Sequence, residues 1–295
     1  MKFEILGGGK MGDKKKTTNI DNEVVQHFGK EWAKFNYSDG TADIALDLQF
    51  KAYTEPIDVN SFDNFNAIAA DFGAGSGRWT ERLKPYFKKI YALEPSIEAV
   101  GVLNSKFNDD TQIVILNESV ERNSIPDSSL DFAMSLGVLH HIPNTQKALI
   151  DVSSKIKSGG LFLCYLYYKI EDKPLHYRII FSLVNFARNI VSRLPHFARM
   201  IMAKLIALII YLPLARLARV RKKAGKDISN IPLHHYADMP FVMLENDALD
   251  RFGTRLEQRF NKQEITSMLE VADFEISTLK FSSIEPFWTF SIKKK

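Results

Sequence analysis

Cysteine is almost absent from this sequence of 295 residues, in which Cys164 stands alone. A single cysteine excludes an internal disulfide framework and a zinc site built from cysteines, and it fits a reducing compartment. The first sixteen residues lack an apolar stretch of signal-peptide length, so a cytoplasmic location is expected. Extreme composition is absent as well, because 45% hydrophobic and 25% charged residues are ordinary values for a folded globular protein.

Acidic residues are missing from one long segment. Residues 175–226 contain eleven Lys and Arg and no Asp or Glu, whereas the rest of the chain has 28 basic and 35 acidic residues.

Long uncharged runs are missing too, since the longest in this segment, residues 205–215, has eleven residues and contains Pro213. A membrane-spanning helix needs about 20 apolar residues. We therefore expect no transmembrane helix here, and we expect Pro213 to interrupt the helical pattern.

This segment belongs to a predicted helical insertion, residues 171–255, which we call the basic insertion. Three interpretations of it stay open. It packs over the functional site as a subdomain, it lies on an anionic membrane surface, or it binds nucleic acid. Its high apolar content disfavours nucleic acid. Its arginines at 178, 188, 193, 199, 216 and 219 do not fall on one helical face, so a single amphipathic helix is not expected.

From Phe65 onwards, short apolar runs alternate with helical patterns. Such alternation is typical of parallel βαβ units with helices on both faces of the sheet. The last two strands lie too close in sequence for a crossover helix, so we expect them to be antiparallel. The predicted fold is α/β, a Rossmann-like, mostly parallel sheet of seven strands with an antiparallel last strand. The predicted strands are residues 66–72, 89–94, 112–117, 130–136, 160–168, 275–280 and 287–292.

The predicted domain boundaries follow from the same pattern. Residues 1–60 form an N-terminal tail and helical cap, because 21–36 and 42–53 show helical spacing. Residues 61–170 and 256–295 form the core, and the basic insertion follows the fifth strand. The lysine run at 14–16 predicts a solvated, mobile tail.

A glycine-rich turn, ADFGAGSGRW at residues 70–79, follows the first predicted strand. A dinucleotide fingerprint that starts at Gly73 needs a glycine where Arg78 stands. A phosphate-binding P-loop needs Lys and Ser or Thr directly after Gly77, and these are missing too. The turn therefore predicts neither a dinucleotide nor a phosphate ligand.

Two acidic residues indicate a different ligand. Asp71 ends the first strand, where it would repel a pyrophosphate and attract positive charge. Glu94 ends the second strand, 17 residues after the last glycine of the turn, where an acid typically accepts hydrogen bonds from ribose hydroxyls. Together these residues predict a nucleoside with a cationic substituent and no phosphate, which is S-adenosylmethionine.

The sequence here resembles the class I S-adenosylmethionine-dependent methyltransferases, type 11-like. The glycine turn and residues 91–96, 118–143 and 149–168 match the order and spacing of that family's motifs over about a hundred residues. The flanks, residues 27–37, 165–174 and 245–260 among them, resemble members associated with surface-polysaccharide or secondary-metabolite genes. The resemblance implies that the cofactor contacts Asp71, Gly73, Ala74, Gly75, Ser76, Gly77, Glu94, Pro95, Glu118, Ser119, Val120, Leu136, Gly137 and Val138.

Histidines are the candidate bases for the transfer. A hydroxyl acceptor benefits from a base whose ordinary pKa is near neutral. His140 and His141 follow the fourth predicted strand, at the carboxyl edge of the sheet where ligands bind in such folds. Neighbours cannot both point the same way, so at most one faces the acceptor, and His141 is preferred. The alternative is that both pack against the next helix.

Further candidates for the acceptor site are Tyr165, Tyr167 and Tyr168, which end the fifth strand, and His235 in the basic insertion. The alternatives are aromatic core for the tyrosines and a solvent-facing loop for His235. No metal is expected, because adjacent histidines are poor co-ligands and no carboxylate stands at ligand spacing.

The predicted function is S-adenosylmethionine-dependent methyl transfer to a hydroxyl of a small molecule, a sugar or a lipid-linked acceptor. Nucleobase amino groups are disfavoured, because no N-P-P-Y-like turn follows the fourth strand. A non-catalytic cofactor-binding or scaffold protein is the alternative, and Arg78 disfavours a nicotinamide-dependent oxidoreductase. The expected location is cytoplasmic, with peripheral attachment to the inner membrane face left open. The sequence does not specify the acceptor or the oligomeric state.

Overall fold

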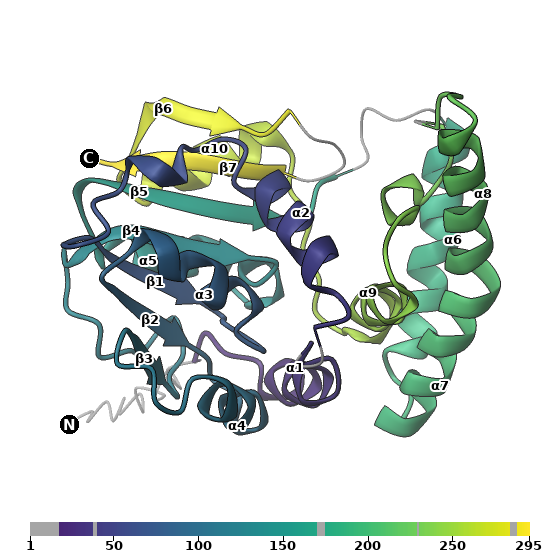
Figure 1. The fold of residues 1–295 in the computed structure, drawn as a ribbon, viewed down its shortest axis with the longest axis horizontal. Coiled ribbons are helices and arrows are strands. Elements are labelled where there is room, and N and C mark those ends of the chain that lie inside the picture. The colour runs from purple at the N-terminus through teal and green to yellow at the C-terminus, as the bar shows by residue number, and fades with distance from the viewer. Residues whose placement is uncertain (1–17, 38–39, 170–174, 229, 284–287) are drawn as a thin grey trace, which may run out of the picture.

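A computed structural model describes residues 18–37, 40–169, 175–228, 230–283 and 288–295 (Figure 1). The predicted lysine-rich tail lies outside these residues. The predicted alternation of strands and helices is present, and most boundaries lie within two residues of the predicted ones. The strands are β1 (Ile68–Phe72), β2 (Lys89–Leu93), β3 (Ile113–Leu116), β4 (Leu130–Leu136), β5 (Ile156–Leu166), β6 (Phe274–Phe281) and β7 (Trp288–Lys294).

The seven strands form one sheet in the order β3-β2-β1-β4-β5-β7-β6. The first five strands are parallel, and β7 runs antiparallel to both β5 and β6. The predicted Rossmann-like, mostly parallel sheet with antiparallel last strands is confirmed. The helices are α1 (Asn22–Lys34), α2 (Asp43–Tyr53), α3 (Arg78–Leu83), α4 (Ile97–Lys106), α5 (Thr145–Ser153), α6 (Leu175–Val191), α7 (His196–Ile206), α8 (Leu212–Lys223), α9 (Phe241–Gly253) and α10 (Lys262–Val271).

Hydrophobic side chains cover both faces of the sheet, as a parallel sheet requires. Along β4, Phe132 and Met134 belong to a core that includes residues of α2 and α3. Ala133, between them, belongs to the opposite core, to which α5 and α10 contribute. Because successive strand residues point to opposite faces, one apolar strand serves both cores.

The strand order sets the place of the site. The chain runs outward from β1 to β3 and then returns to place β4 on the other side of β1. Ligands bind at such a switch point, beyond the carboxyl ends of the strands. Figure 1 shows these ends facing α1, α2 and α9, with α6, α7 and α8 forming an outer layer beyond α9.

Strand β5 begins four residues earlier than predicted. The sequence pattern predicts a helix over residues 144–156 and starts the fifth strand at residue 160. In the structure Ser153 ends α5, and the pairing register shifts between Leu130 and Phe132. Gly159 has a φ of 77°. The register shift and the left-handed Gly159 together keep the segment that contains Gly159 within the sheet.

The expectation that Pro213 interrupts the basic insertion is wrong. One helix runs from His196 to Lys223, a length of 28 residues, and Pro213 lies inside it. A π-helical segment, Ala207–Tyr211, joins α7 to α8 just before the proline. The wider turn accommodates a residue that lacks an N–H and would clash with an ordinary helical turn. The argument from the eleven-residue uncharged run therefore fails, since this helix could cross a membrane by length and composition.

A buried polar cluster joins α1 to α9. The Tyr37 hydroxyl donates to Asn246 Oδ1 at 2.6 Å, and the Asn246 amide donates to Glu31. Glu31 is fully buried, and burial raises the pKa of its carboxyl well above the ordinary value. The Asn246 side chain therefore satisfies two buried groups at once and fixes α1 over the carboxyl edge of the sheet.

Replacing Asn246 by Ala leaves the Tyr37 hydroxyl and a Glu31 oxygen buried without this partner. We expect the free energy of unfolding to fall by roughly 2–4 kcal/mol, measured by urea denaturation. Asn104→Ala is the matched control, because Asn104 is exposed on α4, and it should change stability by less than about 0.5 kcal/mol. Equal effects of the two substitutions would contradict the role of the cluster.

Candidate active site

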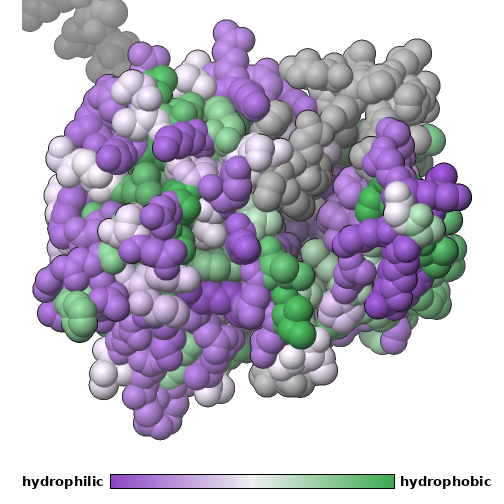
Figure 2. Space-filling view, turned by 45° about the horizontal axis from the view of Figure 1, so that its top comes forward, coloured by the Kyte–Doolittle hydropathy of each residue, from purple (hydrophilic) through white to green (hydrophobic). Residues whose placement is uncertain are grey.

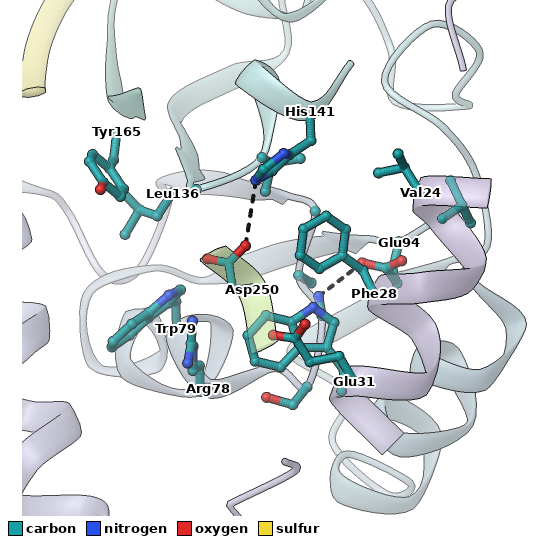
Figure 3. A pocket seen from close by; sticks show the side chains of 18 of the residues that line it. Val24, Phe28, Glu31, Arg78, Trp79, Glu94, Leu136, His141, Tyr165 and Asp250 are labelled. Carbon is teal, nitrogen blue, oxygen red and sulfur yellow. Dashed lines mark hydrogen bonds and ion pairs between the residues drawn. The ribbon is translucent and has the colours of Figure 1, made fainter. Parts of the chain in front are cut away.

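A cavity lies beyond the carboxyl ends of β1 and β4 (Figure 3). Its wall comes from α1, the glycine turn, the loop after β4, the end of β5 and α9. The structure thus brings together segments that are more than two hundred residues apart. Of the predicted site residues, Gly73, Ala74, Gly75, Ser76, Glu94, Pro95, Ser119, Val120, Leu136, Gly137, Val138, His141, Tyr165 and Tyr167 line this cavity.

The glycine turn needs its glycines for two reasons. Gly73 and Gly75 have φ values of 84° and 55°, in the left-handed region that other residues rarely adopt. A Cβ on Gly73 would lie 2.5 Å from Val138 Cγ2, and one on Gly75 would lie 2.8 Å from Trp32 Nε1. The backbone is therefore held close to the loop after β4 on one side and to α1 on the other.

Glu94 ties the turn to the end of β2. Its two carboxyl oxygens accept the N–H of Gly75 at 3.0 Å and the N–H of Ser96 at 2.9 Å. Burial nevertheless raises the pKa of Glu94 to about 7. Burial therefore disfavours the ionised form of Glu94, and hydroxyl donors or a positive charge from a bound ligand would stabilise that form.

Asp71 lies behind the turn and not on the cavity wall. It accepts the Thr80 hydroxyl at 2.7 Å, and burial raises its pKa to about 6. Gly77 also lies behind the wall, with a φ of 74° and its Cα against Phe107. These two residues support the turn from the side of the sheet and α4.

The residues present fit S-adenosylmethionine. Ser76 Oγ is buried beside the cavity and has no hydrogen-bond partner among the described residues, so it is available to a polar ligand. Phe28, Trp32 and Trp79 contribute aromatic surface to the wall, and aromatic faces attract cations. Glu94 would hold the ribose, and Ser119 and Val120 would border the base.

His141 is the histidine that faces the cavity. Its Nδ1 lies 2.7 Å from the carbonyl oxygen of Leu256, and a carbonyl only accepts, so Nδ1 carries the proton. In the neutral ring Nε2 is then an unprotonated acceptor. The buried Nε2 has no hydrogen-bond partner in the part of the chain that the structure describes, and it lies 3.7 Å from Asp250 Oδ1, the contact dashed in Figure 3.

Asp250 is a site residue that the sequence analysis did not find. It lies on α9, and its Oδ2 accepts the Tyr167 hydroxyl at 2.6 Å. Burial raises its pKa, while the nearby His141 lowers it. The available signal was the spacing of Asn246, Asp247 and Asp250, which places them on one helical face within an otherwise basic insertion.

Glu31 is the second residue that the sequence analysis missed. It lies on α1, lines the cavity, and has one carboxyl oxygen without a hydrogen-bond partner. Val24, Phe28 and Trp32 lie on the same helix and line the same cavity. The apolar stripe of α1 was recognised in the sequence, but nothing there indicated what the stripe covers.

Besides Asp71 and Gly77, four predicted residues do not line the cavity. His140 is fully buried and stacks on Tyr167 with ring centroids 3.8 Å apart, and burial lowers its pKa well below the ordinary value. His235 packs on Tyr236, and burial lowers its pKa to about 4. The remaining two are Tyr168, which bridges to Phe260, and Glu118, which accepts from Ser124. Within the described part of the chain, no three potential ligands lie close enough to share a metal ion.

Binding of S-adenosylmethionine should release protons. Donors and positive charge that reach Glu94 stabilise its charged form, so its pKa falls from about 7 in the free protein. The complex then holds fewer protons, and affinity rises as the pH increases toward about 7. Calorimetry at about pH 6.5 in buffers of different ionisation enthalpy measures the release. Glu94→Gln should reduce it, and a heat that is independent of the buffer in the unsubstituted protein would contradict the assignment.

Comparisons with known proteins agree on the family of this region. Residues 70–164, about a third of the chain, match the family described as Methyltransferase domain, Methyltransf_11. A protein of Saccharomyces cerevisiae described as "Probable S-adenosylmethionine-dependent methyltransferase CRG1" is 30% identical over 105 residues, 34% of this chain and 36% of the relative. An uncharacterized methyltransferase of Bacillus subtilis, YcgJ, is 27% identical over 107 residues, 36% of this chain and 42% of the relative.

This chain therefore covers well under half of the length of either curated relative. The crystal structure of the YcgJ protein is 14% identical, with a TM-score of 0.43 over 86% of this chain and 99% of that chain. The family match includes the glycine turn, and the relatives are described as methyltransferases. Residues 70–164 are thus similar to the S-adenosylmethionine-dependent methyltransferases, and this similarity supports S-adenosylmethionine as the cofactor.

Proposed function

We propose that this chain transfers the methyl group of S-adenosylmethionine to a hydroxyl of a small-molecule, sugar or lipid-linked acceptor. The observation that carries the proposal is the position of His141 on the cavity wall, with its Nδ1 bound to the Leu256 carbonyl and with no hydrogen bond to its Nε2 from the described residues. The cofactor supplies an activated methyl group on a sulfonium. The protein residues have to align the acceptor and remove its proton.

His141 is placed to remove the acceptor proton. As the acceptor oxygen forms its bond to the methyl carbon and the carbon–sulfur bond breaks, the hydroxyl proton passes to Nε2. The ring then becomes positively charged while its Nδ1–H stays bound to the Leu256 carbonyl. Asp250 Oδ1, at 3.7 Å, lies where it stabilises that charge. The other product is the neutral thioether.

Tyr167 and Asp250 support the orientation of this base. The Tyr167 hydroxyl occupies Asp250 Oδ2, which leaves Oδ1 directed at the histidine. Phe28 packs against the same imidazole, with ring centroids 4.9 Å apart. The imidazole is therefore held by a backbone carbonyl, a carboxylate and an aromatic ring from three different segments.

The cavity wall also fits the task of aligning the acceptor. Aromatic side chains of Tyr53, Trp79 and Tyr165 pack together on its wall, with ring centroids 5.5 Å apart in each neighbouring pair. Such a wall excludes water and offers flat surface to a sugar or a ring. Alignment of two reactants contributes up to about 7–11 kcal/mol in well-oriented systems.

The alternative of a non-catalytic scaffold has less support. A scaffold would need neither the intact contacts of Glu94 nor a base held with one nitrogen free beside them. The family match removes the support for a nicotinamide-dependent oxidoreductase.

We place the activity in the cytoplasm, since the one cysteine is a buried free thiol and fits a reducing compartment.

Replacing His141 by Gln should lower kcat by roughly 10²–10⁴-fold, because the acceptor proton loses its base. Affinity for S-adenosylmethionine should stay within about threefold, since His141 acts on the acceptor. Asp250→Asn should lower kcat by about tenfold or more through the lost charge partner. Mass spectrometry of a metabolite extract incubated with protein and cofactor identifies the methylated product, which then serves for kinetics.

His234→Gln is the control for these variants. His234 belongs to the other histidine pair and does not line the cavity, so this variant should keep the full kcat. Unchanged kcat in His141→Gln, with unchanged unfolding, would remove the base from the mechanism. Cofactor binding without any methylated product from any extract would favour the non-catalytic alternative.

A further inference from the structure

The outer layer of α6, α7 and α8 exposes large apolar side chains in an ordered way. On α6 the exposed residues recur every three or four positions, and on α7 they follow a similar spacing. The opposite side of α7 and the π-helical segment packs inward through Ala203, Ala207 and Tyr211. The most exposed members of this outer face are Leu183, Phe186, Ile190, Phe197, Ile209 and Val220, at 53% to 76% of full exposure.

This outer face is unusual for a surface that meets only water. Single exposed apolar residues are ordinary, but contiguous helices that each expose several of them mark an interaction site. The helix His196–Lys223 contains an apolar stretch of 18 residues, and only 22% of that stretch is buried inside the protein. Figure 2 shows hydrophobic residues at the outer edge of this layer, next to strongly hydrophilic ones.

The charge of the layer indicates what covers the outer face. Residues 175–226 carry eleven Lys and Arg and no acid, and α8 ends in a group of exposed basic residues. Asp238 pairs with Lys222 and Arg219, which leaves Arg216, Arg221, Lys223 and Lys226 as an excess of positive charge beside Val220. Apolar side chains flanked by cations fit an anionic lipid surface, where the former enter the interface and the latter contact head groups.

We propose that the outer face of α6, α7 and α8 binds the surface of an anionic lipid bilayer. A second copy of the chain fits less well, because a symmetric contact through this face would bring two basic groups together. Nucleic acid fits less well, because the face is largely apolar. The proposal is independent of the proposed function, since none of the six named residues lines the cavity.

The outer face lies on the membrane, and the helix does not cross it. Arg199 of α7 donates to the Gly253 carbonyl at the end of α9, and α7 packs along α9. Helix α9 in turn carries Asp250, which contacts Tyr167 directly after β5, and Asn246, which contacts α1. Moving α7 into the hydrocarbon would separate α9 from these partners. Attachment parallel to the surface leaves the cavity intact and near the lipid.

Flotation of the full chain with lipid vesicles tests the proposal. The protein should float with vesicles of equal parts phosphatidylglycerol and phosphatidylcholine, and it should stay at the bottom with phosphatidylcholine alone. Arg221→Gln, Lys223→Gln and Lys226→Gln together should weaken partitioning at least tenfold, since each basic residue contributes roughly fivefold. Raising NaCl from about 0.1 M to about 0.5 M should have a similar effect.

Substitutions of apolar residues distinguish binding through the outer face from nonspecific hydrophobic adsorption. Phe197→Gln, Ile209→Gln and Val220→Gln together should abolish flotation. The matched control is Ile44→Gln, Phe65→Gln and Ile97→Gln, three residues of 76% to 80% exposure outside the basic insertion, which should float normally. Circular dichroism and cofactor binding check that each variant is folded.

Four results would overturn the proposal. The unsubstituted protein stays at the bottom with anionic vesicles, or it floats equally with neutral ones. The protein is a dimer in size-exclusion chromatography that the apolar variant converts to a monomer, which assigns the face to a second copy. Protein that remains with the vesicles in high salt and at alkaline pH, and leaves only with detergent, would instead show a spanning helix.

Discussion

The hydrogen bond from the Gly75 N–H to Glu94 is the contact on which the site depends. It joins the turn after β1 to the end of β2, and only a left-handed glycine presents the N–H in that direction. Because the turn has no side chains at Gly73 and Gly75, Val138 and Trp32 approach the backbone directly. A nucleoside cavity results, bounded by the sheet edge and by two elements that are distant in the sequence.

The cavity is closed by helices that do not belong to the sheet. Helix α1 contributes Glu31 and Phe28, and α9 contributes Asp250. A buried hydrogen-bond cluster centred on Asn246 holds the two helices together. Residues 70–164 thus supply the glycine turn, Glu94 and His141, and segments outside them supply Glu31, Phe28 and Asp250. The family match therefore covers the predicted cofactor turn and only part of the cavity wall.

The basic insertion combines two roles in one layer structure. Its last helix, α9, forms part of the cavity wall, while α6, α7 and α8 cover α9 from outside. The arginines that do not share a face in a single helix become distributed over a layer: Arg199 faces inward to α9, and Arg216 and Arg221 face solvent. Apolar side chains are distributed in the same way, with Ala203, Ala207 and Tyr211 inside and Phe197, Ile209 and Val220 outside.

Local sequence patterns were sufficient for the sheet, the glycine turn and Glu94, because each depends on residues close together in the chain. The place of His141 at the cavity also follows from its position after β4. Asp250 and Glu31 could not be found in this way, since they reach the site through tertiary packing across more than one hundred residues. Pro213 does not end the helix, because a π-helical segment that the sequence does not reveal accommodates it.

We propose that this domain delivers the cofactor's methyl group to an oxygen atom. The most direct measurement is carbon NMR of the product formed from S-adenosylmethionine labelled with ¹³C in the methyl group. The account predicts a new O–CH₃ resonance that requires the intact protein. A label found only on nitrogen, or one that never leaves the cofactor, would contradict it.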